Sequence, residues 1–255
     1  MNTELNYFLQ TTSNGIPLGS MYSMIAVGYS MVYSLLYQVN FAHGDLYVFG
    51  TFIAFSFINM ALPLPLAILA AGLLTALIGM TIERTVYRPV RYANRIVPMI
   101  SALGAALVLR TIAQVIWGPE PIAFPQFLPA GSFDVGGFKL FQKNIVVLAF
   151  ATVLVLALSW FMKHTKFGRA TQCIVENMEA AQLMGIPLNK IIPLVYGLGG
   201  FFGVIGGIVY SGYYGVISID MGIWGTVKAW PLWPDIERLN YEKDLVGMYL
   251  SAHPL

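Results

Sequence analysis

Apolar residues gather into six long runs along the chain, separated by shorter polar stretches. A transmembrane helix needs about 20 mostly apolar residues, and each run comes near that length. The predicted spans are residues 16–36, 46–62, 64–82, 96–117, 145–162 and 191–217. Pro63 and Pro65 mark a tight break between the second and third spans. The pattern predicts an all-α integral membrane protein, a polytopic helical bundle of about six spans.

The composition agrees with this prediction. Of the 255 residues, 57% are hydrophobic and 10% are charged, whereas soluble domains average about a quarter charged residues. We therefore expect membrane lipid around the bundle. A net charge of +2 gives no reason to expect nucleic acid as a partner. The single cysteine, Cys173, cannot form an internal disulfide or a multi-cysteine metal site.

Basic residues gather in two segments between the spans. Residues 83–95 hold four arginines, and residues 163–190 hold three lysines and one arginine. If the six spans alternate in direction, both segments lie on the same side. Short cytoplasmic loops are enriched in Lys and Arg, so this side is predicted to face the cytoplasm. The Pro- and Gly-rich loop 118–144, which has no helical period, is then predicted to lie on the outer surface.

The sixth span is dense in glycine. Gly199, Gly203 and Gly207 recur every four residues, which places them on one helix face where a neighbouring backbone can approach closely. One interpretation is tight packing within the subunit. The other is that this face lines a subunit interface or a translocation path.

The hexapeptide NFAHGD, residues 40–45, follows the first span. Its polar groups cannot face lipid without partners, so it is either a loop or a broken helix that lines a cavity. A structural turn in which Asn40 or Asp45 caps the next helix is the simpler interpretation. His43 and Gly44 complete the set of candidates for the path. No cluster of ligands accompanies His43, which argues against catalysis or metal binding.

Arg110 lies inside the predicted fourth span. A buried cation usually faces the bundle interior or a water-filled pathway. A shift of the span by a few residues would instead let the side chain snorkel to the interface. Both interpretations stay open.

Residues 163–190 form an amphipathic module between two spans. Apolar positions from Gly168 to Leu183 approximate a helical stripe, and Gly185 with Pro187 ends it. We predict one helix, a glycine turn and a second helix that enters the sixth span. The stripe would fit a groove in a partner protein or lie on lipid headgroups.

Several motifs resemble known permeases. Glu179-Ala180-Ala181, then Gly185, Ile191 and Pro193, resemble the EAA loop of ABC importer permeases. Further segments are similar to the H-type permease subunit of branched-chain amino-acid importers, colinearly from about residue 7 to 229. They are GIPLGSMYSMIAVGYSMVYSLL, VNFAHGDLYVFGTF, IERTVYRPVR, ISALGAALVLR and YGVISIDMGIWGTVKA.

The resemblance implies how the subunits are organised. The EAA-like loop would dock on an ATP-binding subunit, and the residues expected to couple are Gly168, Arg169, Glu176, Glu179, Ala180, Ala181 and Gly185. A second permease chain of the M type, two ATP-binding subunits and a periplasmic or lipid-anchored binding protein would complete the importer in the bacterial inner membrane. The chain has no GxxxxGK[ST] phosphate loop. We therefore expect it to bind no cofactor and to have no ATPase activity of its own.

The final residues do not fit the permease pattern. Residues 235–244 have a soluble composition, and residues 241–255, YEKDLVGMYLSAHPL, resemble a segment of the alpha subunit of bacterial replicative DNA polymerase. We expect a permease domain over residues 1–229, truncated relative to the family, joined as a chimera to a tail too short to fold alone. An unusual permease terminus is the alternative. Loss of the helices that complete the bundle would impair transport.

The function predicted from the sequence is therefore the permease subunit of an ATP-driven importer of Leu, Ile and Val. A permease for amides, urea or another small solute is the alternative in the same class. An ion- or proton-coupled transporter or a channel is the alternative in another class, and a proton-coupled carrier would bury carboxylates in its spans. The sequence places none well inside them. A membrane scaffold is a third class, but it would not explain the module at residues 163–190.

Overall fold

The computed structural model describes residues 3–36, 40–94, 96–135 and 138–222. Most of these residues are helical. In chain order the elements are α1 (Thr3–Leu36), α2 (Ala42–Asn59), α3 (Leu64–Ile82), a π-helical turn η1 (Glu83–Tyr87), a 3₁₀ turn η2 (Arg88–Val90), α4 (Ile96–Trp117), β1 (Ile122–Ala123), β2 (Ser132–Val135), β3 (Phe138–Phe141), α5 (Gln142–His164), α6 (Lys166–Glu176), α7 (Met178–Leu183), α8 (Leu188–Tyr214) and β4 (Val216–Ile217).

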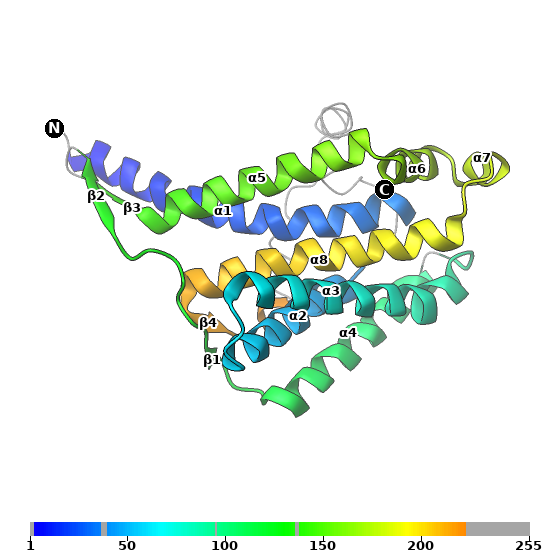
Figure 1. The fold of residues 1–255 in the computed structure, drawn as a ribbon, viewed down its shortest axis with the longest axis horizontal. Coiled ribbons are helices and arrows are strands. Elements are labelled where there is room, and N and C mark those ends of the chain that lie inside the picture. The colour runs from blue at the N-terminus through cyan, green and yellow to red at the C-terminus, as the bar shows by residue number, and fades with distance from the viewer. Residues whose placement is uncertain (1–2, 37–39, 95, 136–137, 223–255) are drawn as a thin grey trace.

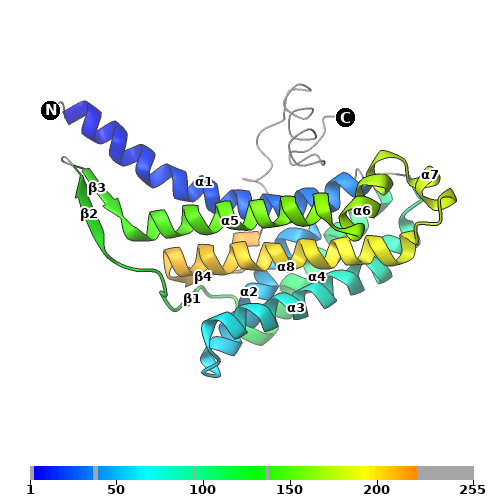
Figure 2. The same ribbon diagram turned by 45° about the horizontal axis from the view of Figure 1, so that its top comes forward.

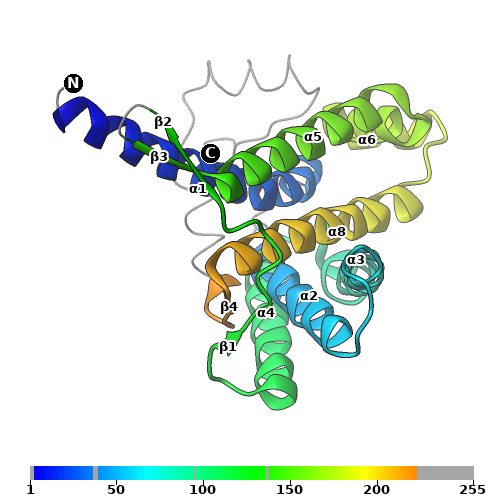
Figure 3. The same ribbon diagram turned by 60° about the vertical axis from the view of Figure 1, so that its left-hand side comes forward.

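Helix α8 lies at the centre of the bundle. On one side α8 packs against α1, which in turn packs against α5 (Figures 1 and 3). On the other side α8 packs against α2 and α3, and α4 packs against α2. Both faces of α8 are therefore covered along most of its length, which explains why its apolar residues extend all round the helix. The all-α bundle predicted from the hydrophobic pattern is confirmed.

The long helices alternate in direction. The start of α1, the β2–β3 hairpin and β4 lie at one end, and α6, α7 and the start of α8 lie at the other (Figures 1 and 2). The turns η1 and η2, which carry Arg84 and Arg88, lie at the same end as α6 and α7 (Figure 1). Both basic segments thus share one end, as the sequence predicted, and the positive-inside rule makes it the cytoplasmic end.

Among the described residues, four helical segments are long and apolar enough to cross a membrane: Leu64–Val90, Ile96–Trp117, Gln142–His164 and Leu188–Tyr214. The first of these is α3 continued through η1 and η2. Helix α1 has 34 residues and extends about 50 Å at 1.5 Å per residue, but polar residues interrupt it. Helix α2 carries His43 and Asp45 in its first turns. The total of six spans stays a prediction.

Two predicted boundaries are wrong. The second span was expected to start at Leu46, but α2 starts at Ala42 and includes residues 43–45. The sixth was expected to reach Ile217, but α8 ends at Tyr214 because Gly215 adopts a left-handed conformation (φ +72°). Beyond it, β4 pairs antiparallel with β1 from the loop 118–144. The same loop contains the β2–β3 hairpin, so it forms short strands that its composition did not reveal.

Glycine allows α1 and α8 to cross at very short range. A methyl group added at Gly28 of α1 would lie 2.5 Å from the carbonyl oxygen of Gly199, and one added at Gly199 would lie 2.8 Å from the carbonyl oxygen of Gly28. Both distances are below normal van der Waals contact, so neither position has room for a side chain. Gly203 and Gly207 continue the close approach along α2, where their nearest neighbours include Tyr47 and Thr51. The glycine face therefore packs within the subunit.

A proline in α1 gives Asn144 a structural role. Pro17 has no N–H, which leaves the carbonyl of Ser13 without its donor within the helix. The side-chain amide of Asn144, at the start of α5, donates to this carbonyl at 3.1 Å, and its Oδ1 accepts from the hydroxyl of Tyr213 at 3.0 Å. Asn144 is 3% exposed. It therefore ties α1, α5 and α8 together at the outer end of the bundle.

The Gly28–Gly199 crossing predicts a large difference between two glycine substitutions. Gly28→Ala should lower the free energy of unfolding by about 1–3 kcal/mol, the usual cost of overpacking, because backbone atoms must move apart. Gly104→Ala is the matched control, since nothing lies within 4 Å of a methyl group there and alanine favours the helix. Thermal unfolding in detergent would measure both. Equal stability of the Gly28→Ala variant and the parent would contradict the proposed crossing.

Candidate functional site

The polar segment 40–45 lies inside the bundle. Asn40 is 2% exposed, His43 1% and Asp45 8%. The segment is neither a loop nor a cap: Phe41 occupies the N-cap position of α2 and no side chain caps that end. The capping hypothesis for Asn40 and Asp45 is therefore wrong. Asn40 instead accepts a hydrogen bond of 2.5 Å from the hydroxyl of Tyr87 through its Oδ1, which connects the start of α2 to the cytoplasmic turn η1.

His43 occupies the crossing of α1, α2 and α8. Its ring lies edge-on to Tyr29, with 5.9 Å between ring centroids, and it faces Gly28 and Gly203, whose missing side chains make room for it. Neither ring nitrogen has a hydrogen-bond partner among the described residues. Those residues also contain no group of three His, Cys, Asp or Glu side chains that could hold a metal ion. His43 is thus buried where three helices meet, and its place along a translocation path stays a prediction.

Arg110 and two carboxylates form a charged cluster beside the start of α2. Arg110 of α4 forms an ion pair with Asp220, which follows β4, and both lie close enough to Asp45 to interact with it electrostatically. The side chain of Arg110 is 20% exposed and that of Asp220 is 71% exposed. Within the described part of the chain, Oδ1 of Asp45 has no hydrogen-bond partner. Arg110 therefore pairs with a carboxylate of the same chain, which the snorkelling interpretation did not predict.

A second buried charge pair lies at the cytoplasmic end. Glu83 of η1 is fully buried and pairs with Arg91, whose side chain is 4% exposed. Arg91 had been counted among the basic residues of an exposed loop, and both Glu83 and Asp45 had been placed outside the spans. The structure corrects this: both carboxylates are buried in helical segments, because each begins or continues a helix beyond the apolar run that marked the span. Because buried carboxylates are present, their expected absence is no longer an argument against a proton-coupled carrier.

The module at residues 163–190 consists of two short helices, not one. Asn177, in an extended conformation, ends α6 and caps α7, with its Oδ1 accepting from the amide of Ala180 at 2.9 Å. Asparagine is favoured at the N-cap position. The prediction of one continuous helix did not take this preference of Asn177 into account. Thr165 caps α6 in the same way through the amide of Gly168 at 3.0 Å. A methyl group at Gly168 would lie 2.1 Å from the carbonyl oxygen of Met162, so the tight α5–α6 turn requires glycine.

A glycine turn closes α7. Gly185 has φ +83°, and the amides of Ile186 and Gly185 donate to the carbonyls of Ala181 and Gln182, both at 3.0 Å. This is the Schellman arrangement, in which a left-handed glycine satisfies the last carbonyls of a helix. The turn leaves Leu183 90% exposed and Met184 77% exposed. We call residues 183–185 the tip of the module.

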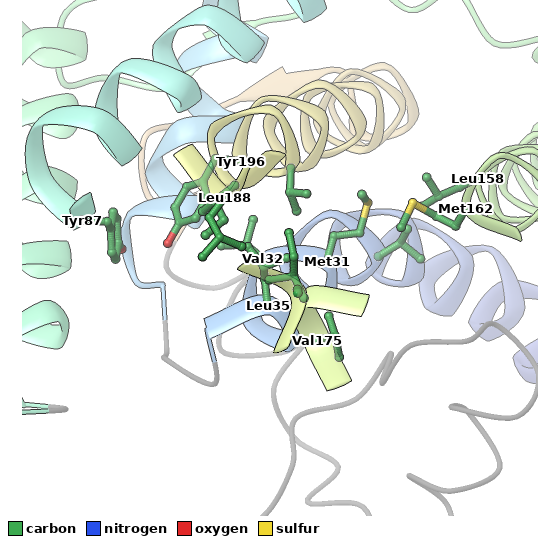
Figure 4. Close-up of a cluster of buried hydrophobic side chains, with 14 of the residues drawn as sticks. Met31, Val32, Leu35, Tyr87, Leu158, Met162, Val175, Leu188 and Tyr196 are labelled. Atoms are coloured by element: carbon green, nitrogen blue, oxygen red, sulfur yellow. The ribbon is translucent and has the colours of Figure 1, made fainter. Parts of the chain in front are cut away.

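The inner face of the module belongs to the core of the bundle. Val175 lies with Met31, Val32 and Leu35 of α1, Leu158 and Met162 of α5, Leu188 and Tyr196 of α8, and Tyr87 of η1 in one apolar cluster (Figure 4). Ile174 and Ala181 join the same cluster. The predicted apolar stripe therefore faces the protein itself at Ile174 and Ala181, while Cys173 and Leu183 are exposed. Among the described residues of the module, the large apolar side chains that are exposed are Leu183 and Met184 of the tip.

The predicted site residues fall into two groups at different depths. Asn40, His43, Gly44, Asp45, Arg110, Gly199, Gly203 and Gly207 surround the start of α2, whereas the seven predicted coupling residues belong to the module. In the module Arg169, Glu176, Glu179, Ala180 and Gly185 are exposed, and Gly168 and Ala181 are buried. Sequence reasoning missed Gly28, Tyr87 and Asp220. An arginine inside an apolar span, which needs a counter-charge, was the available signal for Asp220.

Comparison with known proteins agrees with this architecture. The family described as branched-chain amino acid transport system / permease component matches residues 11–231. The high-affinity branched-chain amino acid transport system permease protein LivH of Salmonella typhimurium is 33% identical over 243 residues, covering 90% of this chain and 79% of LivH. The permease BraD of Pseudomonas aeruginosa, named for the same transport, is 32% identical and covers 89% of this chain and 78% of BraD.

More distant relatives carry other names. The galactose/methyl galactoside import permease MglC of Haemophilus influenzae is 28% identical over 169 residues, covering 63% of this chain and 47% of MglC. No solved structure matches the chain significantly. The predicted tail at residues 230–255 lies outside the described residues, so its resemblance to a polymerase segment stays a prediction.

The family match covers α1 from residue 11 onward, all the other long helices, the buried segment at the start of α2 and the module with its exposed tip. The chain therefore belongs to the family of permease components of branched-chain amino acid transport systems.

Proposed function

We propose that this chain forms part of the membrane pathway for Leu, Ile and Val in an ATP-driven importer of the bacterial inner membrane. The observation that carries the proposal is the match along nearly the whole chain to permeases named for this transport. Relatives named for sugars are less similar. A multi-pass location in the membrane follows from the family and from the apolar helices.

The exposed tip supports an assembly in which the motor is a separate protein. We infer that two ATP-binding subunits dock at the cytoplasmic end, that a second permease chain of the M type completes the pathway, and that a periplasmic or lipid-anchored binding protein delivers the solute. ATP would be bound by the partner subunits and not by this chain. Leu183 and Met184 would enter a groove of an ATP-binding subunit, and the exposed Glu179 would lie at the edge of that contact.

The module is connected to α8 in a way that would transmit a displacement of the tip to the centre of the bundle. Two residues separate the tip from Leu188, where α8 begins, and Ala181 shares the apolar cluster with Leu188 and Ile192. Packed cores transmit displacement because they have little free volume. Closure of the ATP-binding subunits would therefore move α8, and the glycine crossings would carry this movement to α1 and α2. This is the alternating-access mechanism that we infer.

The solute can be tested by uptake. Membrane vesicles that contain this chain with its partner subunits should accumulate radiolabelled leucine only when ATP is supplied. Excess isoleucine or valine should reduce leucine uptake at least tenfold, whereas acetamide, urea and galactose should not reduce it. The truncation predicted from the sequence would lower the rate of leucine uptake without changing the order in which the competitors reduce it. Competition by amides or sugar as strong as that by isoleucine would contradict the proposal.

The tip can be tested with a matched pair of substitutions. Met184→Asp should abolish co-purification with the ATP-binding subunits and reduce uptake at least tenfold, because a carboxylate cannot enter an apolar groove without losing its hydration. Met60→Asp is the control, since Met60 is 70% exposed in the turn between α2 and α3 at the opposite end. Both variants should unfold at the same temperature as the parent. Normal co-purification of Met184→Asp would exclude the tip as the docking site.

A further inference from the structure

Arg110, which forms a charged cluster with Asp45 and Asp220, lies inside an apolar helix that is long enough to cross a membrane. Arg110 is 14 residues from the start of α4 and seven residues from its end, which is about 21 Å and about 10 Å along the helix axis at 1.5 Å per residue. Charges at this depth are expensive and usually mark the route of a solute or ion. The cluster also joins three separate segments, namely α2, α4 and the turn after β4. A structural ion pair would not require the third charge.

Asp45 has the features of a group that awaits a ligand. It is 92% buried, being 8% exposed, yet its Oδ1 has no hydrogen-bond partner in the described ranges. A buried carboxylate oxygen without a donor is unfavourable, because it has lost its hydration and gained no hydrogen bond in return. Gly222 lies against it: a methyl group at position 222 would be 3.2 Å from this oxygen and 2.8 Å from the carbonyl oxygen of Gly44. A side chain at residue 222 would therefore block the approach to Asp45.

The signs of the three charges indicate what the ligand is. In their ionised forms two carboxylates and one guanidinium leave a net negative charge, which would attract a cationic group. Arg110 disfavours a ligand that is only cationic, because its guanidinium repels a positive charge, but the same guanidinium is well suited to pair with a carboxylate. A molecule with an ammonium group and a carboxylate on the same carbon atom satisfies both requirements. Free α-amino acids have this structure.

An aromatic pair lies beside the charges. Phe49 is four residues after Asp45 on α2, and Trp117 is seven residues after Arg110 on α4, so each lies on the same helix face as its charged neighbour. Their rings meet edge to face with 5.5 Å between centroids, and both are half-buried. An apolar side chain attached to a bound head group would find this surface next to it.

We propose that Asp45 and Arg110 form a binding site for the head group of a zwitterionic amino acid, with Phe49 and Trp117 beside its apolar side chain. Asp45 accepts hydrogen bonds from the ammonium group. Arg110 exchanges its pair with Asp220 for one with the carboxylate of the solute. The inference rests on the proposed function and adds a site within the membrane that recognises the solute independently of the binding protein.

Equilibrium binding tests the site. The full chain, assembled with its partner subunits in nanodiscs without binding protein or nucleotide, is titrated with radiolabelled leucine. Saturable binding is expected, and Asp45→Asn and Arg110→Gln should each weaken it at least tenfold. Arg110→Lys, which keeps the charge, should bind better than Arg110→Gln. Asp134→Asn, an exposed acid in the hairpin β2–β3, is the control that should bind normally.

Two analogues of leucine identify which charged group of the solute Asp45 and Arg110 each bind. 4-Methylpentanoate lacks the ammonium group and 3-methylbutylamine lacks the carboxylate, so each should compete at least tenfold less well than unlabelled leucine on the parent. In Asp45→Asn the advantage of leucine over 4-methylpentanoate should largely disappear, an effect that general destabilisation would not produce. Parent-like leucine binding by both Asp45→Asn and Arg110→Gln, or no saturable binding by the parent, would overturn the inference. If the parent still takes up leucine in that case, the proposed function would remain supported even though the binding site is excluded.

Discussion

The close contact between α8 and its neighbours is the constraint on which the rest of the structure depends. In a membrane, helices gain little from the hydrophobic effect when they associate, and packing has a larger share in holding them together. The carbonyl oxygens at Gly28 and Gly199 show how near the backbones come. Because α8 is covered on both sides, it connects the α1–α5 pair to the group of α2, α3 and α4. Larger residues at these crossings would separate the two groups.

The same close packing creates the polar interior. Helix α2 starts inside the bundle, so His43 and Asp45 are buried although their sequence context is that of a loop. Glycine at positions 28 and 203 leaves room for the imidazole ring of His43, and Gly222 leaves room beside Asp45. Buried polar atoms without partners are rare in folded proteins. Their concentration at the start of α2 is consistent with a region that meets solute or water during the transport cycle.

The two functional regions are linked through shared packing. The module at the cytoplasmic end contributes Val175 and Ala181 to the cluster that contains Tyr87 and Tyr196 (Figure 4). Tyr87 in turn donates to Asn40 just before α2. A displacement of the tip and a rearrangement around the start of α2 therefore involve the same side chains. Movement of the module would therefore be felt at the start of α2 through packed side chains.

The sequence by itself determined the helical bundle, the shared end of the two basic segments and the glycine turn at Gly185, because hydropathy, charge and backbone preference are local properties. It also singled out Asp45 and Arg110 as unusual. It could not show that α2 begins four residues before its apolar run, or that Asn177 divides the module, because a polar residue inside a helix and one at its end look alike. The partnership of Arg110 with Asp220, 110 residues apart, and the burial of Glu83 against Arg91 were decided only by tertiary structure. Such pairs depend on which helix faces meet, and that is fixed by the packing of the whole bundle around α8.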